Sequence, residues 1–356
     1  MTFADFSRKY DSFGVPSFKV SVDGQDILRK HLVEVISVTF EDALDVSHRF
    51  AFTVNDPEFK WLDSSLFEPG KIVEVKMGYR DKLSTMIVGE ITSLMPSFPP
   101  AGSGAPQIEI SGYDLFYQYT RASKNKTWKN KQDSEVVEEI IKSGPVKNKL
   151  TPHIERTDVV FPETVQNGET DYAFIKKLAE RNFFEFSIKE KDVYFGSPEK
   201  NKTPIITLEY GRSLLSFNPE LNTANQVSQV IVRGWNPIAK KEIVGKSKSA
   251  KGGEGQSGGE MMAKIYGTVE QRVTDKTVSS QQDADNLANS IFNKLSVGLV
   301  RGSAECIGIP EIRAGATIIL KGLGKKFSQK YFIERSTHSI SSSGYKTTFS
   351  VRGDIT

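Results

Sequence analysis

One series of short strand patterns occurs twice in this chain of 356 residues, once in its first third and again at its end. "PGKIVEVKMG" (69–78) and "AGATIILKGL" (314–323) both carry Gly in the second place, then apolar residues two apart, then Lys and Gly. An alternating strand follows each, and each series closes on a strand that reaches Gly and then Asp, "QIEISGYD" (107–114) and "FSVRGD" (349–354). Because strand side chains alternate between two faces, the pattern predicts one kind of β-domain in two copies.

The N-terminal parts of the two copies can be aligned in the same way. "DVSHRFAFTVND" (45–56) lies over "NQVSQVIVRGWN" (225–236), since both have Val-Ser followed by a strand with alternating apolar residues. The copies are therefore expected at residues 15–120 and 206–356, after an N-terminal extension at 1–14. Placing "MIVGEITSL" over "YFIERSTHSI" pairs Glu90 with Glu334, and placing the closing strands "ISGYD" and "VRGD" over each other pairs Gly112 with Gly353.

The segment between the copies, residues 121–205, has a different pattern. "SEVVEEIIKSG" predicts a helix capped by Asp133 or Ser134, and "DYAFIKKLAERN" predicts a second helix capped by Thr170 or Asp171. Two short strands follow, "FFEFSIKE" and "DVYFG". We therefore expect a small α+β module here, and a β-rich α+β fold for the whole chain.

Within the second copy, the Gly-, Ser- and Lys-rich stretch at 240–262 buries too little apolar surface to order itself, so it predicts a mobile loop. "SSQQDADNLANSIFNKL" after it predicts a helix, with Ser279 or Ser280 as the cap. Lysines gather at 123–131 and 239–253, and we interpret both clusters as solvated loops.

Composition excludes several classes of protein. The net charge is +3, with 47 basic and 44 acidic residues, which does not indicate a dedicated nucleic-acid binder. No run of about 18 apolar residues predicts a transmembrane helix, and the N-terminus lacks the apolar core of a secretory signal. The one cysteine, Cys306, can form no internal disulfide and no zinc cluster.

No pattern of catalytic, cofactor-binding or metal-ligating residues stands out. The four histidines lack a second ligand at a known metal spacing, no Gly-x-Ser-x-Gly elbow occurs, and "GGEGQSGG" lacks the Lys-Ser/Thr of a phosphate loop. We interpret the histidines as packing or surface residues, the Arg-Gly-Asp tripeptide as the end of a core strand, and a group of aromatic residues as core of the middle module. These residues are His31, His48, His153, His338, Arg352, Gly353, Asp354, Phe183, Phe184, Phe186, Tyr194 and Phe195.

Four segments in order resemble the phage late control gene D family, the baseplate hub proteins similar to the T-even phage hub and to the N-terminal part of VgrG proteins. They are "VSQVIVRGWNPIAKKEI", "TDYAFIKKLAERNFFEFSIKEKDVYF", "SSQQDADNLANSIFNKL" and the stretch from Ile312 to Gly353. The resemblance covers residues from about 15 to 356. Asn236 and Asn182 depart from it, since the family commonly has Asp and Gly there.

The resemblance implies a fold of two related tube-type β-barrel domains and a structural baseplate hub with no enzymatic activity. It implies a homotrimer whose six β-domains form a ring, adapting a hexameric inner tube to a trimeric spike. It also implies other baseplate proteins as partners, no specific nucleic acid, no membrane insertion, and a place in a virion tail or tail-like particle assembled in the bacterial cytoplasm. Because the sequence stops after the last tube-type strand, we expect the spike to be a separate protein.

Two alternatives stay open on the sequence alone. Tail tips sometimes carry a cell-wall hydrolase, and β-rich domains with aromatic patches often bind glycans or receptors. The repeat of the β-domain favours the hub over both.

Overall fold

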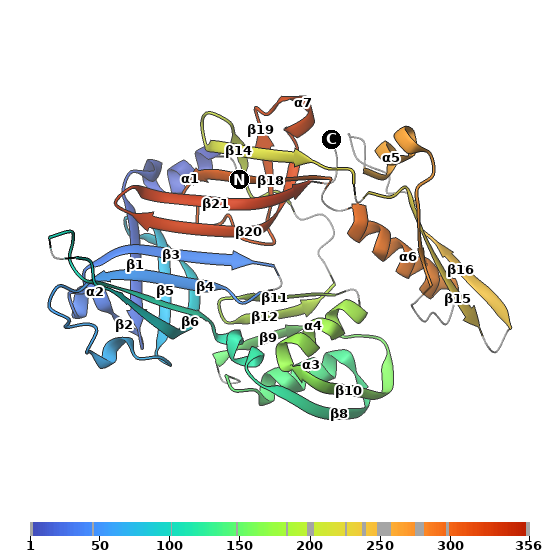
Figure 1. Cartoon of the computed structure of the whole chain (residues 1–356), viewed down its shortest axis with the longest axis horizontal. Coiled ribbons are helices and arrows are strands. Elements are labelled where there is room, and N and C mark those ends of the chain that lie inside the picture. The colour runs from blue at the N-terminus through green and yellow to red at the C-terminus, as the bar shows by residue number, and fades with distance from the viewer. Residues whose placement is uncertain are drawn as a thin grey trace.

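The structure is a computed structural model. It describes residues 3–44, 46–100, 102–146, 149–182, 184–197, 203–224, 226–236, 240–247, 258–274, 281–296 and 299–353. Most of them belong to antiparallel sheets with a few helices (Figure 1), which confirms the predicted β-rich α+β class.

Among the described residues, thirteen strands form one large sheet. Its path runs β14-β18-β21-β20-β3-β4-β7-β6-β5-β1-β2, and β19 pairs with β20 and β13. In chain order these strands are β1 (Pro16–Val22), β2 (Gln25–Asp26), β3 (Val35–Ala43), β4 (Arg49–Asn55), β5 (Ile72–Tyr79), β6 (Lys82–Ser97), β7 (Gln107–Asp114), β13 (Thr207–Glu209), β14 (Leu214–Leu221), β18 (Val300–Ile307), β19 (Thr317–Lys321), β20 (Lys330–Ser341) and β21 (Gly344–Gly353).

The same order of five strands occurs in both halves of this sheet. The first half runs β3-β4-β7-β6-β5, and the second runs β14-β18-β21-β20-β19. If the five strands of each half are numbered along the chain, they lie side by side in the sheet in the order first, second, fifth, fourth, third. The pairings of both halves also share two irregularities, described next, so the likeness extends to single residues.

A β-bulge, one extra residue on one strand, lies at the same two places in each half. The first is between Val35 and Ser37 in β3, and between Leu214 and Ser216 in β14. The second is between Ile91 and Ser93 in β6, and between Ile333 and Arg335 in β20. Because a bulge fixes the local register, Ile91 corresponds to Ile333 and Val35 to Leu214.

The strand-opening glycines correspond as the sequence predicts. The Gly70 and Gly315 amides donate to the carbonyls of Ile91 and Ile333, both at 2.9 Å. Both glycines have positive φ, 96° and 83°, a conformation that other residues rarely adopt. The alignment of Glu90 with Glu334 is wrong by two residues, because Thr92 occupies the bulge that Glu334 occupies.

The same shift affects the closing strands. Gly112 pairs with Ile91, and Val351 pairs with Ile333, so Gly112 corresponds to Val351 and not to Gly353. Asp114 caps the 3-10 helix η3 (Leu115–Thr120) through Phe116 and Tyr117, whereas Asp354 lies outside the described residues.

The front alignment of the two copies is wrong. The segment aligned with 45–56 forms β15 (Gln229–Asn236), which pairs with β16 (Lys241–Lys246) and β17 (Glu270–Val273) in a separate sheet. The strand that corresponds to β4 in the large sheet is β18. A much longer stretch than the expected loop therefore separates β14 from β18.

That stretch has a core of its own. Helix α6 (Gln281–Ser296), which confirms the predicted helix, packs an apolar stripe against the β15-β16-β17 sheet, with Ala284 and Ala288 fully buried. The predicted caps Ser279 and Ser280 lie outside the described residues. The expectation of a mobile loop at 240–262 is wrong where the structure describes it, since β16 and α5 (Gly258–Tyr266) are regular elements. Residues 248–257 lie outside the described part.

The middle module contains both predicted helices, α3 (Asp133–Ser143) and α4 (Asp171–Arg181), over two small sheets. One sheet pairs β8 (Ser123–Gln132) with β10 (Val160–Thr170), and the other holds β9 (Thr151–Ile154), β11 (Glu185–Lys189) and β12 (Asp192–Gly196). The lysine cluster at 123–131 is thus a strand and not a loop. Its lysines pair with carboxylates of the two helices, as in Lys124 with Asp171 and Lys126 with Glu139.

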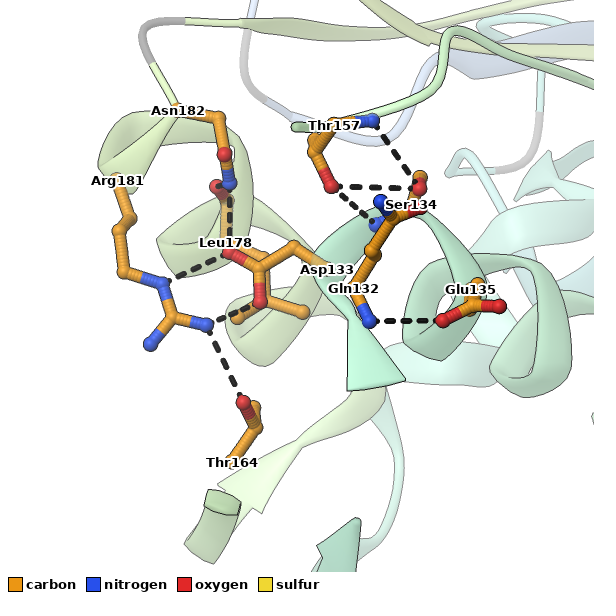
Figure 2. A network of polar contacts seen from close by, with 9 residues as sticks. All are labelled: Gln132, Asp133, Ser134, Glu135, Thr157, Thr164, Leu178, Arg181 and Asn182. Atoms are coloured by element: carbon orange, nitrogen blue, oxygen red, sulfur yellow. Dashed lines mark hydrogen bonds and ion pairs between the residues drawn. The ribbon is translucent and has the colours of Figure 1, made fainter. Parts of the chain in front are cut away.

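Figure 2 shows how the start of α3 is tied to the end of α4. The fully buried Asp133 carboxylate accepts hydrogen bonds from Arg181 Nε at 2.8 Å and from Asn182 Nδ2 at 2.6 Å. The same Asn182 amide donates to Leu178 O at 2.8 Å. Its backbone φ is −95°, so no glycine is needed here. The departure from the family pattern at Asn182 therefore gives the module a polar clamp.

The remaining helices are short. They are α1 (Phe3–Lys9), η1 (Asp11–Phe13), α2 (Ile27–Lys30), η2 (Ser65–Phe67) and α7 (Gly324–Phe327).

Candidate functional site

The two halves of the large sheet meet at one seam, between β20 and β3. The strands are antiparallel, with Arg335 opposite Ala43, His338 opposite Phe40 and Ile340 opposite Val38. One hydrophobic core continues across the seam and contains residues of both halves. The seam therefore joins the two halves into a single body.

A buried carboxylate lies at the centre of the seam. Asp42 is 3% exposed, and it accepts hydrogen bonds from Arg313 Nε at 2.5 Å, from the Ala314 amide at 3.2 Å and from the Ser336 hydroxyl. Burial acts to raise the pKa of Asp42, but the Arg313 guanidinium and the other donors outweigh it and hold that pKa below its usual value. Arg313 also lies over the Phe40 ring, 4.4 Å from its centre.

His338 is the second buried polar group of the seam. Its Nε2 lies 2.9 Å from Ile312 O, which can only accept, so we assign the proton to Nε2. Nδ1 then accepts from the hydroxyls of Tyr345 at 2.9 Å and Thr347 at 3.1 Å. Complete burial lowers the pKa of His338 to about 4, so the ring is neutral at pH 7.

The segment after β18 is held by the first half of the chain. Tyr79 donates its hydroxyl to Gly308 O at 2.8 Å, and Tyr10 donates to Glu311 Oε1 at 2.7 Å. Lys9 forms an ion pair with the same Glu311. These contacts, some 230 to 300 residues apart in the chain, fix the segment that carries Ile312 and Arg313.

An open cleft of about 1430 Å³ lies beside the seam. Its walls are the end of β3, the β9-β11-β12 sheet of the middle module and the segment 310–317. On the module side, His153 stacks on Tyr194 with ring centres 4.8 Å apart, and its Nε2 is 3.0 Å from Asp192 Oδ1. His153 and Tyr194 therefore line the module side of the cleft as a stacked pair.

The predicted roles of the other histidines and aromatic residues can be compared with their positions. His31 contacts Gln25 at the surface, and the ring of His48 lies edge-on to Phe40. Phe186 and Phe195 are buried in the core of the module, and Phe184 packs against it, as expected. Tyr194 differs, since 40% of it is exposed. Phe183 lies outside the described residues.

Arg352 ends a core strand and donates to Glu334 Oε1 at 3.3 Å. Cys306 is fully buried in β18, and burial raises the pKa of its thiol. Among the described residues, no group of three or more His, Cys, Asp or Glu side chains could hold a metal ion.

Sequence reasoning missed Asp42 and Arg313, the residues that define the seam. They are 271 positions apart, and neither stands in a motif. The one available signal is Asp42 itself, an acidic residue in the alternating strand "EVISVTFEDA" at a place where the buried face is otherwise apolar.

Comparisons with known proteins place the fold. A family model described as the Alg8 N-terminal domain matches residues 12–342. No curated protein matches the chain. The structure is similar to the 43 kDa tail protein of prophage MuSo2 from Shewanella oneidensis, with a TM-score of 0.69 and 14% identity over 94% of this chain and 98% of that one.

Two further solved structures share the fold. A tail protein from Neisseria meningitidis MC58 matches with a TM-score of 0.68 and 12% identity, over 96% of this chain and 97% of that one. The E. coli c3393 protein, described as a type VI secretion component similar to T4 tail proteins gp27 and gp5, matches with a TM-score of 0.56 and 14% identity, over 94% and 76%. The fold is therefore that of phage tail and type VI secretion proteins.

Of the helices that the structure describes, none combines the length and the apolar character needed to cross a bilayer.

Proposed function

The chain belongs to the family of the Alg8 N-terminal domain and has the fold of phage tail proteins, and we propose that it is a structural baseplate hub subunit of a contractile tail or injection particle. In this proposal three copies form a ring of six sheet halves. One face of the ring meets a hexameric inner tube, and the other meets a trimeric spike. The protein acts by bearing load and matching symmetries, and it makes or breaks no bond.

One observation carries the proposal: the five-strand unit occurs twice with the same order and the same bulges. A ring of three identical chains has threefold symmetry, but a doubled unit gives each ring six similar surfaces. Closed rings form when head-to-tail contacts repeat around an axis. The doubled unit is the feature that such an adaptor between sixfold and threefold objects needs.

We propose domain boundaries that assign each copy of the five-strand unit to a domain of its own. The first tube-type domain spans 15–120, the small α+β module 121–205, and the second tube-type domain 206–356. The last of these carries the β15–β17 and α6 insertion between β14 and β18. The other baseplate proteins of the particle are further partners, and the particle is assembled in the bacterial cytoplasm.

The mass of the assembly in solution tests the proposal. We expect three times the 39.6 kDa chain by light scattering, either for the purified chain or once the inner tube protein is added. A chain that stays a monomer at every concentration and with the tube protein present contradicts the hub.

The absence of an enzymatic role is tested separately. The purified chain is expected to leave the turbidity of a peptidoglycan suspension unchanged and to bind no glycan on an array. Clearing of the suspension favours a tail-associated hydrolase, and saturable glycan binding favours a receptor-binding module.

A further inference from the structure

The internal seam has a counterpart that is left open. In the second half of the sheet, β20 is longer than β19, and its last part pairs with β3 of the first half. In the first half, β6 is likewise longer than β5, and its last part from Ser93 to Ser97 pairs only with β7 among the described strands. Among the strands that the structure describes, β14, the counterpart of β3, pairs only with β18.

The two open edges are equivalent to the two sides of the internal seam, residue by residue. The shared bulges make Ile91 the counterpart of Ile333, and Val35 the counterpart of Leu214. It follows that Pro96 corresponds to His338 and Pro219 to Phe40. The pair His338–Phe40 in the internal seam therefore corresponds to Pro96–Pro219 across the open edges.

We propose that the open edge of β6 pairs with the open edge of β14 from a second copy of this chain, in the register of the internal seam. This deepens the proposed hub, on which it rests, by naming the contact that closes its ring. The opposed residues are Ser93 with Asn222, Leu94 with Leu221, Met95 with Glu220, Pro96 with Pro219, Ser97 with Asn218, and Phe98 with Phe217.

The side chains match across this register. Every second pair is apolar on both sides: Leu94 with Leu221, Pro96 with Pro219, and Phe98 with Phe217. The pairs between them are more polar and face the other side of the sheet. In the internal seam the corresponding face is the buried one, since Val38, Phe40 and His338 are each 0% exposed.

Exposed apolar side chains gather at both edges. Met95 is 59% exposed and Phe98 60%, and Phe98 contacts the exposed ring of Phe59. On the other edge, 47% of Leu215 is exposed. Large apolar side chains at an unpaired strand edge mark a surface for strand addition, and a second copy supplies a complementary edge of the same fold.

The two prolines make this seam weaker than the internal one. The Leu44 amide donates to Glu334 O at 3.0 Å, so the Phe40 amide, four residues back, also points to β20. Its counterpart Pro219 has no amide hydrogen, and neither has Pro96. The central pair Pro96–Pro219 therefore lacks both of its backbone hydrogen bonds, whereas the pairs of Leu94 and Phe98 on either side keep theirs.

Edge prolines also protect a strand from pairing with unrelated strands. We infer that the ring can come apart while each chain stays folded.

Disulfide trapping tests the register. Ser97 and Asn218 are exposed and lie opposite each other at a pair where side chains approach closely, so Ser97→Cys with Asn218→Cys should link chains into dimers and trimers after mild oxidation. The native Cys306 is buried and stays in place.

The matched control is Thr39→Cys with Ser339→Cys, at the equivalent pair of positions in the internal seam. These two cysteines should form a disulfide within one chain. Ser97→Cys with Glu220→Cys, two residues out of register, should link chains at least about 5-fold less.

A second variant separates folding from assembly. Phe98→Glu should weaken trimer formation at least about 10-fold and leave the melting temperature of the monomer unchanged, whereas Val159→Glu, at a residue 54% exposed on the middle module, should change neither.

A trimer by mass that Ser97→Cys with Asn218→Cys fails to link, or that the out-of-register pair links better, overturns the register and leaves the hub standing. A chain that never assembles overturns both.

Discussion

The two halves of the large sheet share a strand order and two bulges, but they complete the same edge in different ways. In the second half, β20 meets β3 of its own chain, and the contact contains the buried Asp42 and His338 and the partly buried Arg313. In the first half, the equivalent edge of β6 has no strand beside it among the described residues, and Leu94, Pro96 and Phe98 lie on the face that corresponds to the buried face of the internal seam. The polar network therefore belongs to the seam that forms once, within the chain.

The difference has a physical reason. A buried, fully paired polar network tolerates few alternative partners, because each unmatched group costs free energy in a low dielectric. Such a network suits a contact that never has to open. Edges with a proline each and an apolar face can instead meet and separate, because the face that their contact buries, Leu94, Pro96 and Phe98 with Leu221, Pro219 and Phe217, carries no charged group.

The largest effect is expected from the internal seam. Asp42→Ala leaves the mostly buried Arg313 guanidinium without its partner and removes the acceptor for Ser336, so it should cost about 3–5 kcal/mol of unfolding free energy. Leu221→Ala, at the counterpart of Asp42 on the open edge, is the control and should cost less than about 2 kcal/mol. Urea unfolding of both variants measures the difference. Equal losses contradict the distinction between the two seams.

A smaller effect is expected from pH. Unfolded His338 takes up a proton as the pH falls through its ordinary pKa of 6.5, but the folded ring does so only near its pKa of about 4. The folded state is therefore the less protonated one, and stability should fall by about 3 kcal/mol between pH 6.5 and pH 4. The lowered pKa of Asp42 adds a further loss once the pH falls below 3.8, the ordinary carboxyl value.

His338→Gln checks this assignment, because an amide can both donate to Ile312 O and accept from Tyr345. The variant should be less stable at pH 7 but should lose much of the slope between pH 6.5 and pH 4. His153→Gln, at an exposed histidine of the middle module, serves as the control and should keep the slope. A wild-type melting temperature that stays constant from pH 6.5 to pH 4 contradicts a neutral, buried His338.

The smallest effect is expected outside both seams, at Glu139 on α3. Lys131, Lys126 and Trp128 donate to its carboxylate and lower its pKa to about 2. The Glu139 side chain is 34% exposed to solvent, which screens the charges, so Glu139→Gln should cost only about 0.2–1 kcal/mol, and less in high salt. Urea unfolding at low and high salt measures it. A loss of unfolding free energy as large as that of Asp42→Ala would mean that the size of the loss depends on charge pairing alone and not on burial in the seam.

Most elements of the fold could be predicted from local patterns. Phe50, Phe52 and Val54 alternate along β4 and are buried, and Phe174, Ile175 and Leu178 form the buried face of α4. The Asp23-Gly24 dipeptide between two alternating runs predicts a hairpin turn, and both residues have positive φ in the turn between β1 and β2. Not every local pattern holds: residues 57–67, from Pro57 to Phe67, could fill a short helix by sequence, but they are mostly turns and end in the short η2. Asp56 accepts the amides of Trp61 and Leu62 and holds the segment in a loop.

The seam could not be predicted in the same way. Asp42 and Arg313 come together only because β3 pairs with β20, a contact between residues nearly 300 positions apart. No local pattern records which strand lies beside which, since the pairing is decided by the closing of the whole sheet.

The sequence by itself determined most elements of this protein: which segments with alternating apolar residues are strands, which helix faces are apolar, and where Gly70 and Gly315 allow a positive φ. The tertiary structure decided the partners and the register. A strand pattern repeats every two residues, so an alignment shifted by two, such as Glu90 with Glu334, fits the sequence equally well. For the same reason β15 and β18 both match β4 by pattern, and only the hydrogen-bonded ladder of the large sheet selects β18.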